Sequence, residues 1–113
     1  MIRVRYAPEA YALTAVGHAG AGPAGQDLVC AAASALMQTL ESRARSVPAF
    51  RACVTREAGT PLLSVRCAPE EEAREACRAT LETVLAGLSL LASRYPAHVS
   101  CEIIHRKGKE STP

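Results

Sequence analysis

A histidine and a cysteine lie twelve residues apart in the stretch VGHAGAGPAGQDLVCAAASAL, which runs from Val16 to Leu36. Imidazole and thiol are the groups that a cysteine nucleophile needs, because the histidine can take the proton from the sulfur and return it to a leaving group. Between His18 and Cys30 the sequence has almost no large side chains. This segment is therefore either a plain connector or a hinge that lets a substrate enter between the two groups.

Cys30 is expected near the start of the first helix. Asp27 precedes the helical pattern and is a good N-cap. With Asp27 as the cap, Cys30 is the third helical residue, where free N–H groups stabilise a thiolate. The N–H of Cys30 is then also a candidate donor to an oxyanion. The apolar residues that define this helix recur at every fourth position: Leu28, Ala32, Leu36 and Leu40.

Strands are expected on both sides of this helix. In the first strand Ile2, Val4 and Tyr6 alternate with arginines, and a second strand follows from Tyr11 to Val16. Residues 50–68, FRACVTREAGTPLLSVRCA, have the pattern of a hairpin that turns near Gly59. The first helix thus lies between two pairs of strands.

A second helix is expected between Pro69 and Pro96, because proline is favoured in the first turn and cannot continue a helix. Residues 98–106, HVSCEIIHR, then form a last strand. The order β-β-α-β-β-α-β predicts an α+β two-layer sandwich, a mostly antiparallel sheet with both helices on one face. The spacing in the second helix predicts one buried face: Ala73, Cys77, Leu81, Val84, Leu88 and Leu91.

Length and composition indicate one domain over residues 1–105, followed by a basic and polar tail without fixed structure at 106–113. The chain has 113 residues and is 49% hydrophobic, enough for an aliphatic core. Its net charge of +2 does not favour direct nucleic-acid binding. We find neither a signal peptide nor a membrane segment, and therefore expect a cytoplasmic protein.

The five cysteines are odd in number and show neither a C-x-x-C pair nor the spacing of a zinc site. We therefore expect no metal and no cofactor. Cys53, Cys67, Cys77 and Cys101 are interpreted as small hydrophobic residues of strands and of the second helix.

The glycine-rich stretch also matches a nucleotide-binding motif in form. Residues Gly20 to Gly25 fit G-x-G-x-x-G between a strand and a helix. However, Pro23 interrupts the motif, the chain has no room for a doubly wound sheet, and no strand-end acid follows about 20 residues later. These features do not favour a nucleotide.

The sequence resembles the ribosomal-processing cysteine protease family of bacteria in three short motifs and in the interval from histidine to cysteine. In order along the chain, the motifs are GHA, G-x-D-L-V-C-A-A and SAL. The resemblance implies that His18 and Cys30 form a catalytic dyad. It also implies a small α/β homodimer. Such a protein removes a short N-terminal extension from a large-subunit ribosomal protein, cutting after aromatic residues and before a small one.

The family pattern also contains the residues found here as Asp27 and Ser34, which are candidate supporting residues. Asp27 either orients a group near the dyad or only caps the helix. Ser34 lies one turn after Cys30, and its hydroxyl either bonds towards the sulfur or back-bonds to the Cys30 carbonyl.

The glycines of the connecting segment favour a mobile lid that opens for an extended peptide and closes His18 onto Cys30. The function predicted from the sequence is therefore that of a cysteine endopeptidase. The alternative is a non-catalytic ribosome-associated binding module that uses the basic segment 105–109 against RNA phosphates. The candidate hinge residues are Gly17, Gly20, Gly22 and Gly25.

Overall fold

The first strand, β1 (Ile2–Ala7), shows how the sheet is built. Ile2, Val4 and Tyr6 are buried, whereas Arg3 and Arg5 are exposed, as the alternation in the sequence predicts. The computed structural model of the chain describes residues 1–17, 24–57 and 62–105, and only the backbone of residues 24–27. The predicted turn near Gly59 and the tail at 106–113 lie outside these residues.

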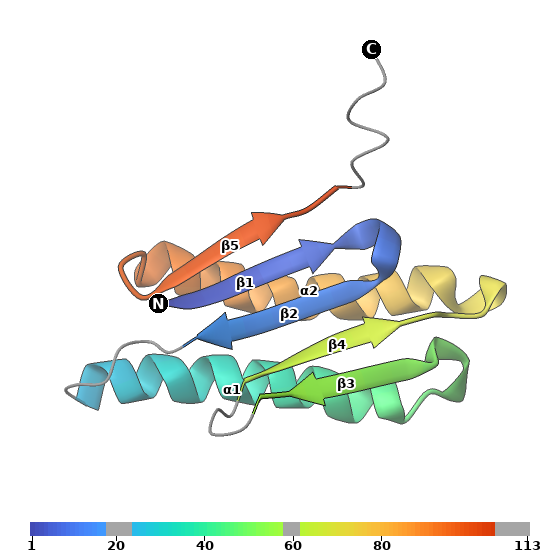
Figure 1. Cartoon of the computed structure of the whole chain (residues 1–113), viewed down its shortest axis with the longest axis horizontal. Coiled ribbons are helices and arrows are strands. Elements are labelled where there is room, and N and C mark those ends of the chain that lie inside the picture. The colour runs from blue at the N-terminus through green and yellow to red at the C-terminus, as the bar shows by residue number, and fades with distance from the viewer. Residues whose placement is uncertain (18–23, 58–61, 106–113) are drawn as a thin grey trace, which may run out of the picture.

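The five strands form one mixed sheet in the order β3-β4-β2-β1-β5 (Figure 1). The other four strands are β2 (Ala12–Gly17), β3 (Ala52–Arg56), β4 (Leu63–Cys67) and β5 (Val99–Ile103). All neighbouring strands are antiparallel except β1 and β5, which are parallel. The prediction of a mostly antiparallel sheet is therefore confirmed.

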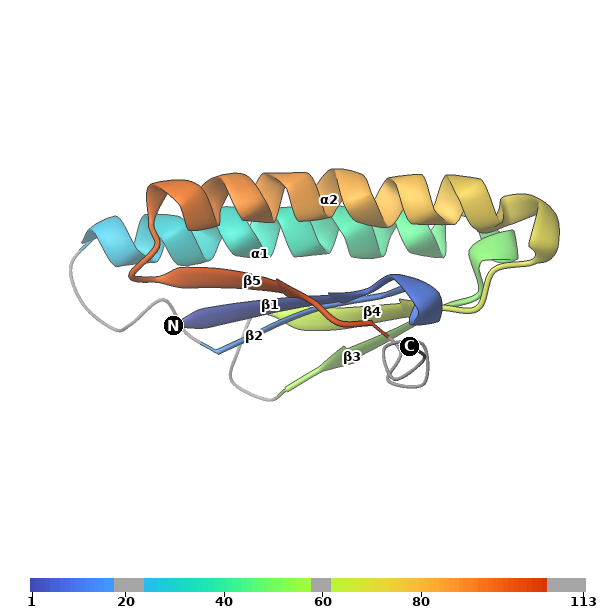
Figure 2. The same ribbon diagram turned by 90° about the horizontal axis from the view of Figure 1, so that it is seen from above.

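Two long helices, α1 (Ala24–Arg45) and α2 (Arg74–Arg94), cover one face of the sheet (Figure 2). They run in opposite directions, so α1 begins and α2 ends at the same end of the molecule, next to the end of β2 (Figure 1). Short 3₁₀ turns at Pro8–Ala10, Pro48–Phe50 and Glu71–Ala73 complete the connections. The predicted two-layer α+β architecture is confirmed.

The core lies between the helices and the sheet and consists of aliphatic side chains. The second helix buries the face that its sequence predicts. Ala73, in the turn before α2, and Leu91 are partly buried and pack against the core. The fully covered positions of this face are Cys77, Leu81, Val84 and Leu88.

The predictions for α1 were wrong in two respects. The helix begins at Ala24 and not after Asp27. Ala24 and Gln26 have high helix propensity, and the low propensity of Gly25 is not enough to end the helix between them. In addition, Leu28 is 70% exposed and does not belong to the buried face. The residues that α1 buries against the core are Val29, Ala33, Met37, Leu40 and Ala44.

Polar contacts tie the helices to the sheet at two places. The Tyr6 hydroxyl donates to the Glu82 carboxylate at 2.9 Å, which links β1 to α2. The Arg56 guanidinium donates through both terminal nitrogens to the Glu41 carboxylate, which links the end of β3 to α1. This ion pair and the neighbouring Arg45 hold the pKa of Glu41 below its ordinary value.

Within the described part of the chain, no helix has the length and apolar character needed to cross a membrane.

Candidate active site

Gly17 is the last residue of β2 and immediately precedes His18 in the sequence. It pairs with Ile2 of β1, and its φ of 99° lies in a region that favours glycine. A Cβ atom at this position would also collide with the backbone oxygen of Met1. Of the predicted site residues, His18, Gly20 and Gly22 lie outside the described residues.

Cys30 lies on α1 at the end of the molecule where β2 finishes. Its side chain is partly buried and packs against the hydrophobic core. Because the helix begins at Ala24, Cys30 is the seventh helical residue and not the third. The free N–H groups of the first turn belong to residues 24–27, and the N–H of Cys30 is used inside the helix. The predicted contact of Cys30 with the free helix terminus is therefore wrong.

Asp27 and Gly25 are both residues of α1. Asp27 is the fourth helical residue, so the predicted N-cap role is wrong, and Gly25 is the second helical residue and not part of the connecting segment. The N-cap must precede the first helical residue, which is Ala24 here. Nothing in the described residues places the Asp27 side chain.

Ser34 lies one helical turn after Cys30 and is only 7% exposed. Its hydroxyl makes no hydrogen bond within the described part of the chain, so neither of the two expected bonds is present. Thr39, further along the same helix, does back-bond to the Ala35 carbonyl at 2.7 Å. A buried hydroxyl without a partner costs about 1–3 kcal/mol. Ser34 is thus an unusual residue beside the candidate nucleophile.

The remaining cysteines differ in their environment. Cys67 and Cys77 are both buried. Burial raises the pKa of the Cys77 thiol to about 12 and also raises the pKa of the Cys67 and Cys101 thiols. Cys53 lies in a strand, as predicted, but it is exposed. In β3 it lies on the face of the sheet away from the helices.

Comparison with protein families places this small α+β domain in the class of cysteine proteases. The sequence model of the family described as cysteine protease Prp matches residues 1–100, and the chain belongs to this family. His18 and Cys30 both lie within the matched range.

Solved structures have the same fold. An essential ribosomal processing protease Prp from S. aureus, with a covalently linked product peptide, has a TM-score of 0.77 and 20% identity, over 92% of this chain and 100% of that chain. The same protease with a substrate peptide has a TM-score of 0.75 and 19% identity over the same shares. SMU.848 from Streptococcus mutans has a TM-score of 0.73 and 21% identity, over 93% of each chain.

Among curated protein sequences, none is significantly similar to this chain. Within residues 1–17, 24–57 and 62–105, no group of three or more His, Cys, Asp or Glu side chains could hold a metal ion.

Proposed function

We propose that the protein is a cysteine endopeptidase that removes a short N-terminal extension from a large-subunit ribosomal protein. The observation that carries this proposal is the family match over residues 1–100, which includes both His18 and Cys30. The S. aureus protease with the same fold has been solved with a substrate peptide and with a covalently linked product peptide. A thiol that forms a covalent bond to a peptide fits this chemistry.

In the proposed reaction, His18 takes the proton from the Cys30 thiol, and the thiolate attacks the carbonyl carbon of the scissile peptide bond. His18 then returns the proton to the leaving amine as the C–N bond breaks and a thioester forms. Water, deprotonated by His18, attacks the thioester, and the proton passes back to the sulfur as the carboxylate product leaves. Both half-reactions therefore use the same two residues.

Ser34 and Asp27 are proposed as supporting residues. The unpaired, buried Ser34 hydroxyl lies one turn from Cys30, and a hydrogen bond to the closed site would remove the cost of leaving it unpaired. Gly17, Gly20 and Gly22 are proposed as the hinge of a lid over Cys30. We also propose that the protein acts in the cytoplasm as a homodimer and needs no cofactor.

Thiol reactivity tests the choice of nucleophile. We expect iodoacetamide to alkylate Cys30 before Cys53, although Cys53 is the more exposed, because in the proposed dyad His18 takes the proton of Cys30. Cys67 and Cys77 should react only after unfolding, because burial and raised pKa values leave little thiolate. Peptide mass mapping after limited labelling measures this order. Faster labelling of Cys53 would contradict the proposed dyad.

Cleavage of two matched peptides tests the substrate class. A peptide with Phe-Phe followed by Ala or Ser should be cut after the second Phe. The same peptide with Asp at both Phe positions should not be cleaved, because its carboxylates would lose their hydration in the site without gaining a partner. Mass spectrometry of the products gives the cut site.

The outcomes of the peptide test separate the hypotheses. Equal cleavage of both peptides would contradict the proposed specificity. Cleavage of neither, with a reactive Cys30, would mean a protease with another substrate. Cleavage of neither, with an unreactive Cys30, would favour a non-catalytic ribosome-associated binding module.

A further inference from the structure

The two edges of β2 are paired over different lengths. The ladder with β1 continues to Gly17, the residue before His18. The ladder with β4 stops at the pair of Thr14 and Ser64, although β4 continues to pair with β3 as far as Leu63. In Figure 1 the arrowhead of β2 accordingly extends beyond the start of β4. We call the space between the end of β2 and the start of β4 the notch.

The hydrogen bonds of β1 show which way its main chain faces. The Ile2 N–H donates to the His98 carbonyl at 2.8 Å, and the Ile104 N–H donates to the Tyr6 carbonyl at 2.8 Å. Both contacts are made on the β5 side of β1. Since main-chain groups alternate along a strand, Arg3 faces the opposite side, towards β2.

This alternation fixes the direction of the polar groups at the end of β2. Arg3 is paired with Val16, so Val16 directs its N–H and carbonyl towards β1. The Ala15 carbonyl and the Gly17 N–H therefore face the notch, on either side of Val16. The ladder with β4 does not extend to these two groups. Among the described residues no strand pairs with these two groups, which form a short stretch of sheet edge just before His18 in the sequence.

A cavity of about 180 Å³ lies in the notch. It is lined by Ala15 and Val16 on one side and by Leu63 and Ser64 on the other. Sites for complete small ligands usually have roughly 300–1,000 Å³. The notch is thus of a size for one or two residues of an extended chain.

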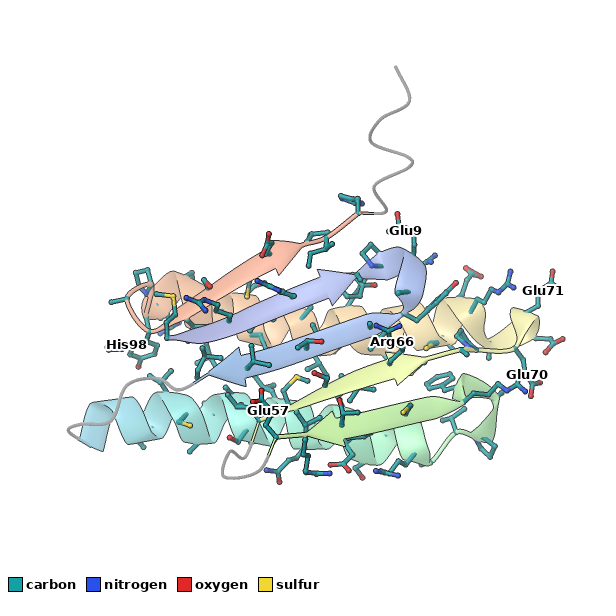
Figure 3. The ribbon with its side chains drawn as sticks, viewed as in Figure 1. Glu9, Glu57, Arg66, Glu70, Glu71 and His98 are labelled. Atoms are coloured by element: carbon teal, nitrogen blue, oxygen red, sulfur yellow. The ribbon has the colours of Figure 1, made fainter. Side chains whose placement is uncertain are left out.

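The notch wall contains one acidic side chain that forms no ion pair within the described part of the chain. The wall includes Arg56 and Glu57, but the Arg56 guanidinium is paired with Glu41. Glu57 forms no ion pair with any residue that the structure describes. Figure 3 shows Glu57 at the end of β3, near the start of β4. A basic side chain in the notch would therefore find a carboxylate without a competing cation.

We propose that the notch binds the substrate main chain as an added strand beside Val16, and that Glu57 accepts a basic side chain of the same segment. An extended peptide that pairs with an open sheet edge gains affinity from main-chain hydrogen bonds and specificity from alternate side chains. Val16 lies two residues before His18 in the sequence, so the proposed strand binds beside the residues that immediately precede the proposed catalytic histidine. The proposal rests on the proposed peptidase function and deepens it.

Backbone methylation of the substrate tests the added strand. A series of Phe-Phe-Ala peptides with one lysine, each with a single N-methyl group at a successive residue, is compared by KM. Added-strand binding predicts that KM rises about tenfold at a single residue, the one whose N–H donates to the Ala15 carbonyl, because β2 offers one carbonyl acceptor in the notch. Methylation of the residues on either side should leave KM unchanged.

Replacing the carboxylate tests the role of Glu57. Glu57→Gln is expected to raise KM about three- to tenfold for the lysine peptide and to leave KM unchanged for a norleucine peptide of the same length. Glu71→Gln is the matched control, since Glu71 is an exposed carboxylate at the opposite end of the molecule (Figure 3). It should change neither value.

Binding to Cys30→Ala, measured by fluorescence anisotropy with the same peptides, separates this proposal from the proposed function. Wild-type cleavage with neither a methylation-sensitive residue nor a Glu57 effect would overturn the notch and leave the peptidase. A single methylation-sensitive residue in binding, without cleavage by the wild type, would support the notch and contradict the peptidase. Absence of both binding and cleavage would overturn both.

Discussion

Cys30→Ala and His18→Ala are each expected to abolish measurable peptide cleavage while the protein stays folded. The first variant lacks the sulfur that attacks the peptide bond, and the second lacks the group that moves the proton, a loss of about 10²–10⁴ in rate. Cys30 is only partly buried at the border of the core, so its truncation should cost about 1 kcal/mol of stability or less. Cleavage is measured with the Phe-Phe-Ala peptide, and folding by circular dichroism during heating.

Cys53→Ala is the matched control for this experiment. Cys53 is an exposed thiol on the face of the sheet away from the helices, so the variant should cleave at the wild-type rate. Activity that survives in Cys30→Ala, or in His18→Ala, would remove that residue from the mechanism.

Gly17→Ala is expected to lower the free energy of unfolding by at least about 2 kcal/mol and to reduce cleavage strongly. At a φ of 99° any side chain is strained, and the new methyl group would collide with the Met1 backbone oxygen. Because this backbone cannot shift without breaking the β1–β2 ladder, the chain should leave the sheet in another direction, displacing His18. Chemical denaturation and peptide cleavage measure the two effects.

Gly87→Ala provides the comparison within the same protein. Its Cβ would lie 2.9 Å from Cδ2 of Leu36, the mobile end of a partly buried side chain. Alanine is favoured over glycine inside a helix by about 1 kcal/mol, which offsets the cost of moving Leu36. We expect nearly wild-type stability and cleavage. Equal effects of the two substitutions would show that Gly17 has no special conformational role.

Patterns set by a single element were predictable from the sequence. Alternation identified β1, and the helical spacing identified the buried face of α2, because both depend on local geometry. The parallel pairing of β1 with β5 was not predicted, since alternation does not specify which strands are neighbours. The early end of the β2–β4 ladder was not predicted either, because alternation does not show how far two strands pair. The proposed role of Glu57 depends on this end of the ladder and was therefore not predicted.

The buried face of α1 was misassigned because a constant spacing of four residues does not follow a helix. Each step of four turns about 40° beyond a full circle, so positions from Leu28 to Leu40 drift off one face. The observed buried set includes one step of three, between Met37 and Leu40, which corrects the drift. Cys30 was found from its type and its family motif. Its place within the helix was wrong because Gly25 was interpreted as loop.

The pairing of β1 with β5 also has a consequence for the order in which the protein matures. Ile2 faces Val99, so the first strand completes its pairing only with the last one. Contacts between residues so far apart in the chain form late in folding, and a chain still being translated cannot form them at all. Ile2 pairs with Gly17 in the sheet, and its N–H donates to the carbonyl of His98, just before β5. This hydrogen bond cannot form before His98 has been added to the chain. The end of the sheet that precedes His18 in the sequence is thus completed last, and we expect a nascent chain that still lacks β5 to be inactive in the proposed cleavage.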